Sequence, residues 1–127
     1  MSIRATVLLI DDDASIRRLC DKLLRRKGLE VIQADSGESA RNEFRHHNHR
    51  ISLAFVDLHL PDCSGEDLAS EFHTQRADLP IVFFSGNLPP EGELNKDGSP
   101  FFYLKKPFTR DTLNDVLIKT GIIPSPE

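Results

Sequence analysis

Five short apolar runs divide the chain, and four of them end in acidic, hydroxyl or lysine side chains. The first run, residues 7–10, reads VLLI and is followed directly by three aspartates, Asp11 to Asp13. A short apolar run without alternation is typical of a strand that is buried on both faces. Such strands belong to parallel sheets covered by helices on both sides, so this feature restricts the fold more than any other.

Segments with helical spacing separate the apolar runs. In the first of them, apolar residues recur at intervals of three and four, which predicts one buried helix face formed by Ile16, Leu19, Cys20, Leu23 and Leu24. Further helices are expected from Ser36, after Gly65 and from Thr109, and the expected strands are 7–10, 29–34, 51–57, 79–85 and 101–104. This alternation predicts a parallel sheet with right-handed crossovers and helices on both faces.

The composition is that of one ordinary globular domain. The chain has 127 residues and a net charge of −4, so nothing global indicates binding to nucleic acid or to an anionic membrane. Its two cysteines make no disulfide framework, and no signal peptide is recognisable, which leads us to expect a cytoplasmic location. No stretch approaches 18 apolar residues, so no membrane span is predicted.

The segment 86–100 interrupts the alternation of strands and helices. It contains three prolines and three glycines, and its apolar residues are only two leucines. Both residue types disfavour helix interiors. We therefore predict no regular helix longer than about two turns in residues 88–100.

Polar side chains follow four of the expected strands. Asp11 to Asp13 follow the first strand, Asp57 ends the third, Ser85 ends the fourth and Lys106 comes just after the fifth. The carboxyl ends of parallel strands meet at one edge of the sheet, which is where such folds bind ligands. Taken singly, each residue is most simply a turn, cap or solvated residue, but their common edge favours a chemical role.

Clustered carboxylates need a counter-charge. Oxygen ligands without histidine or cysteine favour a hard cation, most simply Mg²⁺, which commonly shares phosphate oxygens. The Asp57 carboxylate is then a candidate nucleophile toward a phosphoryl group. The metal, Lys106 and the Ser85 hydroxyl would neutralise the charge on the transferring group.

The ordered stretches VLLIDDD, VDLHLPDCSG, VFFSG and YLKKPF resemble the receiver domain of two-component response regulators, of the chemotaxis-regulator type. The resemblance covers about residues 5 to 120. It implies an α/β fold with a doubly wound, five-stranded parallel sheet of order 2-1-3-4-5 (flavodoxin-like). The chain departs from the family at the segment 86–100, where its prolines and glycines predict a degenerate fourth helix. The resemblance also implies a receiver domain of residues 1–121, with residues 122–127 as a tail or the start of a linker.

The resemblance assigns a role to each polar residue at the sheet edge. Asp57 matches the phosphoacceptor, and Pro61 completes its motif. Asp12 matches a direct ligand of Mg²⁺, whereas Asp11 acts mainly through water. Asp57 itself and the backbone carbonyl of His59 match the remaining protein ligands.

The residues after the fourth and fifth strands match the switch of the family. Ser85 matches the switch hydroxyl, Lys106 the phosphate-binding lysine and Tyr103 the switch aromatic residue. The resemblance further suggests a cis peptide bond between Lys106 and Pro107, a geometry that costs little before proline.

The function implied is that of a phosphoacceptor in a phosphorelay, not of an enzyme acting on other substrates. A histidine kinase or a histidine phosphotransfer domain would donate the phosphoryl group in a Mg²⁺-dependent reaction, changing the surface offered to an effector domain or another protein. Direct nucleic-acid binding is not expected. The shortened segment 86–100 resembles that of receivers joined to hybrid sensor kinases, which favours a piece of a larger protein such as a hybrid sensor kinase or a multidomain regulator. A stand-alone regulator stays open as the alternative.

Two other functions stay open at this point. The D-x-D pattern of Asp11 and Asp13 suits a phosphatase of the haloacid dehalogenase type that uses Asp11 as nucleophile, although no second acidic pair follows Ser85 in a suitable setting. A pseudo-receiver that binds a partner without phosphorylation is the third hypothesis, and the complete set of acids, hydroxyl and lysine argues against it.

Overall fold

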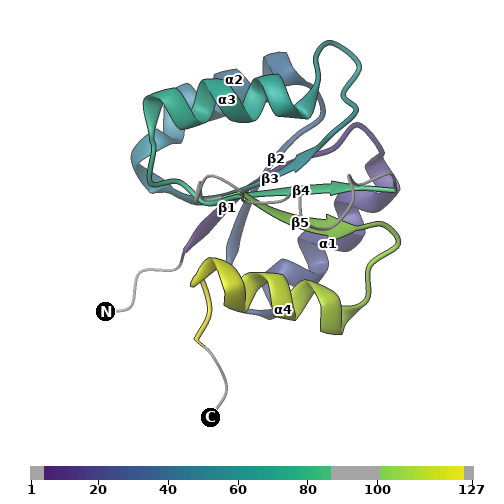
Figure 1. The fold of residues 1–127 in the computed structure, drawn as a ribbon. Coiled ribbons are helices and arrows are strands. Elements are labelled where there is room, and N and C mark those ends of the chain that lie inside the picture. Colours follow the sequence, from purple (N-terminus) through teal and green to yellow (C-terminus); the bar gives the residue numbers. More distant parts are fainter. Residues whose placement is uncertain (1–4, 87–100, 125–127) are drawn as a thin grey trace.

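The computed structural model describes residues 5–86 and 101–124. Five parallel strands form one sheet in the order β2-β1-β3-β4-β5, which confirms the predicted topology (Figure 1). The strands are β1 (Thr6–Ile10), β2 (Glu30–Ala34), β3 (Ile51–Asp57), β4 (Ile81–Ser85) and β5 (Phe101–Lys105). All residues of β1 and β4 are buried, as expected for strands covered on both faces.

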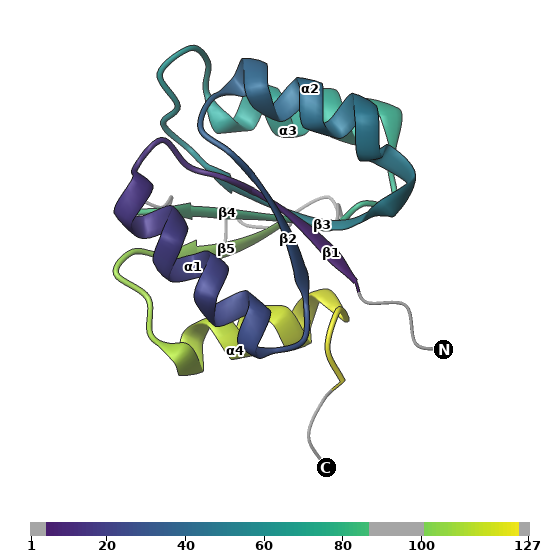
Figure 2. The same ribbon diagram turned by 180° about the vertical axis from the view of Figure 1, so that it is seen from behind.

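Two pairs of helices cover the sheet, α2 and α3 on one face and α1 and α4 on the other (Figures 1 and 2). The helices are α1 (Ala14–Arg26), α2 (Gly37–His47), α3 (Gly65–Gln75) and α4 (Arg110–Thr120), and a short 3-10 helix, Asn48–Arg50, follows α2. None of the helices in the described ranges has the length and hydrophobicity needed to span a bilayer. The prediction for residues 88–100, including the degenerate fourth helix, lies outside the described residues.

Local capping signals set the helix starts. The Asp13 carboxylate accepts hydrogen bonds from the backbone N–H groups of Ser15 and Ile16 at the start of α1. Reciprocal capping boxes open α2 at Ser36 and α4 at Thr109. These contacts satisfy backbone donors that have no partner within the helix, which is why the starts could be predicted from short-range sequence.

We expect replacement of Thr109 by alanine to lower the free energy of unfolding by about 1 kcal/mol, because the first turn of α4 loses its cap. The Thr109 hydroxyl accepts a hydrogen bond from the Thr112 backbone N–H at 3.1 Å. Urea unfolding measures the change, and Thr109→Ser is the control because it keeps the hydroxyl. Equal losses in the two variants would contradict the capping explanation.

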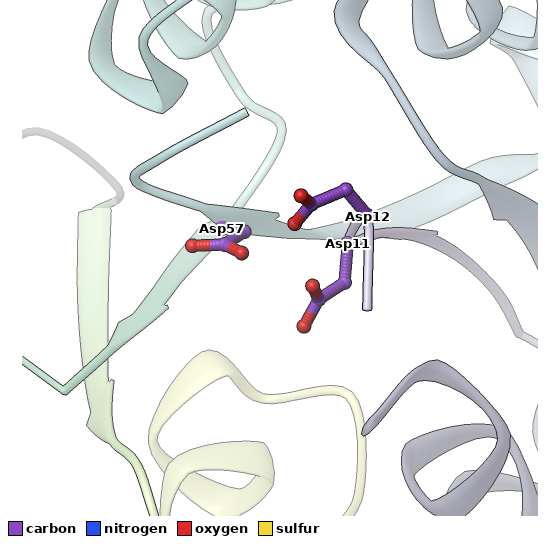
Figure 3. Close-up of side chains that lie close together, drawn as sticks. All are labelled: Asp11, Asp12 and Asp57. Atoms are coloured by element: carbon purple, nitrogen blue, oxygen red, sulfur yellow. The ribbon is translucent and has the colours of Figure 1, made fainter. Parts of the chain in front are cut away.

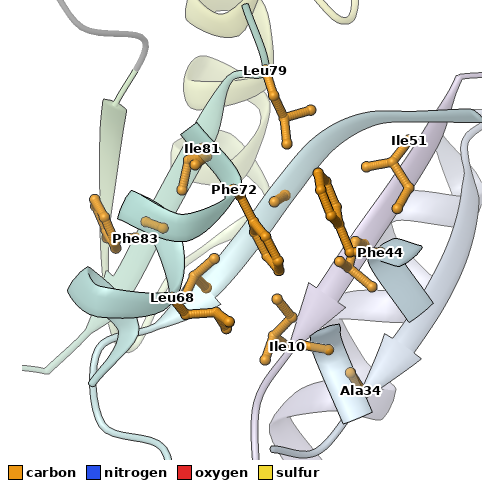
Figure 4. Close-up of a cluster of buried hydrophobic side chains, with 14 of the residues drawn as sticks. Ile10, Ala34, Phe44, Ile51, Leu68, Phe72, Leu79, Ile81 and Phe83 are labelled. Atoms are coloured by element: carbon orange, nitrogen blue, oxygen red, sulfur yellow. The ribbon is translucent and has the colours of Figure 1, made fainter. Parts of the chain in front are cut away.

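The hydrophobic core has two parts, one on each side of the sheet. Between the sheet and the α2–α3 pair, the rings of Phe44 and Phe72 stack with their centroids 4.2 Å apart (Figure 4). On the other side, the rings of Phe55 and Phe84 meet edge to face at 6.0 Å. Burial of both sheet faces holds the strand ends in fixed positions, so side chains at the edge are presented by a rigid support.

The buried apolar face of α1 is narrower in the structure than the sequence spacing predicts. Cys20 and Leu24 are buried, whereas Leu19 is 48% exposed. Five residues at this spacing span a wide arc, and Leu19 lies at its outer edge.

At the other end of the chain, Ile122 and Ile123 pack against the core shared by α1 and α4. The division into a domain of residues 1–121 and a tail of 122–127 stays a prediction.

Candidate functional site

Three carboxylates meet at the carboxyl edge of the sheet. Asp11 and Asp12 follow β1, and Asp57 is the last residue of the neighbouring strand β3. One oxygen from each carboxylate lies within 4.8 Å of the others, and the side chains face a common space (Figure 3). Asp11 and Asp57 are buried, whereas Asp12 is exposed to solvent.

Backbone hydrogen bonds orient the two buried carboxylates. Asp11 Oδ1 accepts a hydrogen bond from the backbone N–H of Asp13 at 2.9 Å. Asp57 Oδ1 accepts one from the backbone N–H of His59 at 3.1 Å. In both residues the second oxygen, Oδ2, contacts Lys106. Each carboxylate is thus fixed through one oxygen by its own turn and directs the other into the site.

Lys106 supplies the counter-charge. Its Nζ lies 2.9 Å from Asp11 Oδ2 and 3.4 Å from Asp57 Oδ2. The same nitrogen lies 4.6 Å from the centroid of the Phe84 ring, a cation–π arrangement that supports the ammonium group from the apolar side. The Lys106–Pro107 peptide bond is cis, as predicted from the sequence.

Burial and charge compete in setting the protonation of this cluster. Burial raises the pKa of Asp11, although hydrogen bonds from Asp13 and Lys106 oppose the shift. Burial alone would lower the pKa of Lys106, but the hydrogen bond and negative charge of Asp11, with those of Asp57, raise it above its ordinary value. Lys106 thus contacts two of the three clustered carboxyl groups, Asp11 and Asp57, and the oxygens of all three lie close enough together to bind a cation.

The predicted switch residues lie on β4 and β5. Ser85 ends β4, is 3% exposed, and its carbonyl accepts a hydrogen bond from the Lys106 backbone N–H at 2.9 Å. Tyr103 is half-buried in β5, paired in register with Phe83, and their ring centroids are 5.4 Å apart. Ser85 thus shares the edge with the acids, whereas Tyr103 lies within its strand. His59 is exposed and is the second residue of the loop that follows Asp57.

Two residues that make hydrogen bonds in or beside the loops of this site were missed in the sequence. Arg17 of α1 donates from Nη1 to the backbone carbonyl of Asp11 at 2.7 Å. Asp62, in the loop after β3, accepts hydrogen bonds from the first two backbone N–H groups of α2. The only sequence signal for Asp62 was its place beside Pro61 in a turn, and nothing indicated its partner 25 positions earlier.

Gly65 allows the start of α3 to approach the Asp57 backbone. A Cβ at this position would lie 2.2 Å from the Asp57 carbonyl oxygen, so an added side chain displaces backbone. We expect Gly65→Ala to cost about 2 kcal/mol of unfolding free energy. Urea unfolding tests this, with Ser70→Ala on the exposed side of α3 as control. A loss no larger than that of the control would show that the helix start moves freely.

Comparison with known proteins identifies this arrangement. The family model of the response regulator receiver domain matches residues 7–118, so the chain belongs to the receiver domain family of two-component response regulators. It is 32% identical over 115 residues to the response regulator receiver protein CpdR of Brucella abortus, covering 87% of this chain and 92% of CpdR. The match gives no support to the phosphatase or pseudo-receiver hypotheses.

Other relatives are longer than this chain. It is 32% identical over 119 residues to the transcription factor SKN7 of Saccharomyces cerevisiae, covering 89% of this chain but 18% of SKN7. The chain also spans only about half of several further relatives. Among solved structures, the response regulator TrrA of Thermotoga maritima in complex with Mg²⁺–BeF is 26% identical with a TM-score of 0.79, covering 93% of this chain and 99% of that one.

Proposed function

We propose that Asp57 accepts a phosphoryl group from a phosphohistidine of a histidine kinase or a histidine phosphotransfer domain. The observation that carries this proposal is the position of Asp57. It ends a buried strand, and Asp11 and Asp12 lie beside it. Lys106 Nζ lies 3.4 Å from Oδ2 of its carboxylate. Rigid placement of a nucleophile beside compensating charge is what phosphoryl transfer requires.

The transfer exchanges one bond to phosphorus for another. The Asp57 carboxylate attacks phosphorus, a P–O bond forms, the P–N bond to the donor imidazole breaks, and neutral imidazole leaves. Lys106 neutralises charge on the transferring oxygens, and the Ser85 hydroxyl, at the same edge, donates to one of them. Later attack by water on the acyl phosphate releases inorganic phosphate and restores the carboxylate.

Mg²⁺ fits the donor set of the site. Asp12 and Asp57 would hold it directly together with the His59 backbone carbonyl, and Asp11 would act mainly through water. The oxygens are hard ligands, three carboxylates converge within 4.8 Å, and the related TrrA binds Mg²⁺–BeF. When bound, the cation neutralises the phosphoryl oxygens.

The output is a change of surface around β4 and β5. Movement of Ser85 toward the phosphoryl group would free space for Tyr103, whose ring packs on Phe83, to turn inward. Such a two-state element needs only one added charge to bias it. We further propose that the chain acts in the cytoplasm, catalyses only its own phosphorylation and dephosphorylation, and passes its signal to an effector domain or another protein.

Intact mass spectrometry with acetyl phosphate and Mg²⁺ tests the proposal. We expect the mass of one phosphoryl group to be added when Mg²⁺ is present. No such addition is expected when a chelator removes the metal before acetyl phosphate is added. Absence of an adduct under both conditions, in protein that binds Mg²⁺, would favour a binding module that does not use its acidic site.

A further inference from the structure

The loop between β3 and α3 is attached at its tip to a helix from another part of the chain. In residues 58–64, the side chain of Asp62 accepts two hydrogen bonds from α2, one from the Gly37 N–H to Oδ1 at 2.7 Å and one from the Glu38 N–H to Oδ2 at 2.9 Å. These donors belong to the first turn of α2, where backbone N–H groups have no partner within the helix. Asp62 therefore caps a helix 25 positions away in the sequence.

Close packing reinforces these hydrogen bonds. A Cβ on Gly37 would lie 2.4 Å from Cys63 Sγ and 3.1 Å from Asp62 Oδ1. Gly37 is not among the glycines with positive φ in the described chain, so backbone conformation does not explain glycine there. Its lack of a side chain leaves the space that the loop tip occupies.

Internal hydrogen bonds connect the loop tip to the site. The Leu60 N–H donates to the Cys63 carbonyl at 3.3 Å, and the Gly65 N–H donates to the Leu58 carbonyl at 2.9 Å. His59 and Ser64 form an isolated antiparallel bridge between the two arms of the loop. A displacement of the tip is thus transmitted to His59 and to the peptide that follows Asp57.

We propose that Asp62 is a positioning residue that holds the His59 carbonyl and the Asp57 carboxylate in place for a divalent cation by tying their loop to α2. The proposal rests on the proposed function, because it concerns the same acidic site. Groups that orient metal ligands commonly change metal affinity by about tenfold or more when removed. The hydrogen bonds from Gly37 and Glu38 also lower the pKa of Asp62, which shows that they favour its charged form.

Two variants of Asp62 separate positioning from charge. Asp62→Ala removes both acceptors, whereas Asp62→Asn removes the charge and one acceptor but keeps one side-chain oxygen, which can still cap the first turn of α2. Calorimetric titration with Mg²⁺ alone should show affinity lowered about tenfold in Asp62→Ala and by a clearly smaller factor in Asp62→Asn, which keeps one of the two hydrogen bonds. The control is Glu38→Gln, which removes a nearby exposed charge without altering the backbone donor.

A second pair of variants tests the contact from the helix side. Gly37→Ala should weaken Mg²⁺ binding because the new Cβ displaces Cys63, and Cys63→Ala in the same chain should restore it by removing Sγ. In phosphorylation by acetyl phosphate, the Mg²⁺ concentration for half-maximal rate should rise in Asp62→Ala and in Gly37→Ala. The rate at saturating Mg²⁺ should change little, because the nucleophile and Lys106 are intact.

Each outcome decides the proposal. Wild-type affinity in Asp62→Ala overturns it. Equal weakening in Asp62→Asn and Asp62→Ala shows that the hydrogen bond kept by asparagine does not hold the loop, and overturns it as well. If the wild-type chain fails to bind Mg²⁺, the proposed function fails instead. The attachment of the loop is then judged by amide exchange at Leu60 and Gly65, which should be faster in Asp62→Ala than in Glu38→Gln; equal exchange rates would overturn the inference.

Discussion

Replacement of Asp57 by asparagine is expected to abolish the phosphoryl adduct while leaving the fold intact. The amide has nearly the shape of the carboxylate and can still accept a hydrogen bond from His59, but it lacks the nucleophilic oxygen anion. Removing a nucleophile normally costs several orders of magnitude in rate, so we expect no adduct on the timescale that labels the wild-type chain. Intact mass spectrometry with acetyl phosphate and Mg²⁺ measures this directly.

The control for this prediction is Asp67→Asn, an exposed carboxylate in the first turn of α3. Its side chain lies outside the acidic cluster, so it should be labelled like the wild-type protein. Asp11→Asn distinguishes the remaining hypotheses. It should slow labelling by weakening the metal site, but the adduct should still form on Asp57. An adduct that survives in Asp57→Asn and disappears in Asp11→Asn would instead make Asp11 the nucleophile, as in the phosphatase hypothesis.

The unfolding free energy of Asp57→Asn should also rise. Asp57 and Asp11 both contact Lys106, so two carboxylates compete for one ammonium group at a buried edge. Taking one away relieves repulsion at little cost in shape. A gain in stability together with loss of labelling is the usual sign of a site kept for function, not for folding.

Local sequence signals were enough to predict most of the secondary structure. The apolar runs gave the strands, and Asp13, Ser36 and Thr109 marked three helix starts, because a cap is a contact between residues two or three positions apart. The strand order was a different matter. It followed from resemblance to a family, since periodicity shows that strands are buried but not which strands are neighbours.

Long-range contacts account for what the sequence left open. Polar residues at the ends of parallel strands were expected to share an edge, and the structure brings Asp11, Asp12, Asp57 and Lys106 together there. Lys106 Nζ lies closer to Asp11 than to Asp57 and sits over the Phe84 ring, and no spacing in the sequence encodes these side-chain placements. The attachment of Asp62 to Gly37 joins two turns that the pattern of each segment leaves unrelated.

Replacing Lys106 by methionine should lower the free energy of unfolding by about 3 kcal/mol and severely slow phosphorylation. Methionine preserves most of the apolar stem but removes the ammonium group, which lies over the Phe84 ring. Asp11, whose side chain is fully buried, then loses its only cationic partner among the described residues, and an unpaired buried carboxylate is costly. Urea unfolding without Mg²⁺ measures the loss.

The neighbouring Lys105 provides the matched control, because it is an exposed lysine one position earlier, at the end of β5. Lys105→Met should change stability by less than about 0.5 kcal/mol. A double-mutant cycle with Asp11→Asn should show that the two substitutions are not additive, with a coupling of about 1–3 kcal/mol for groups in contact. Additive effects, or equal losses in the two lysine variants, would mean that Lys106 is merely a solvated residue. Added Mg²⁺ should stabilise Lys106→Met more than it stabilises the wild-type chain, because a bound cation supplies the counter-charge that the lysine no longer provides.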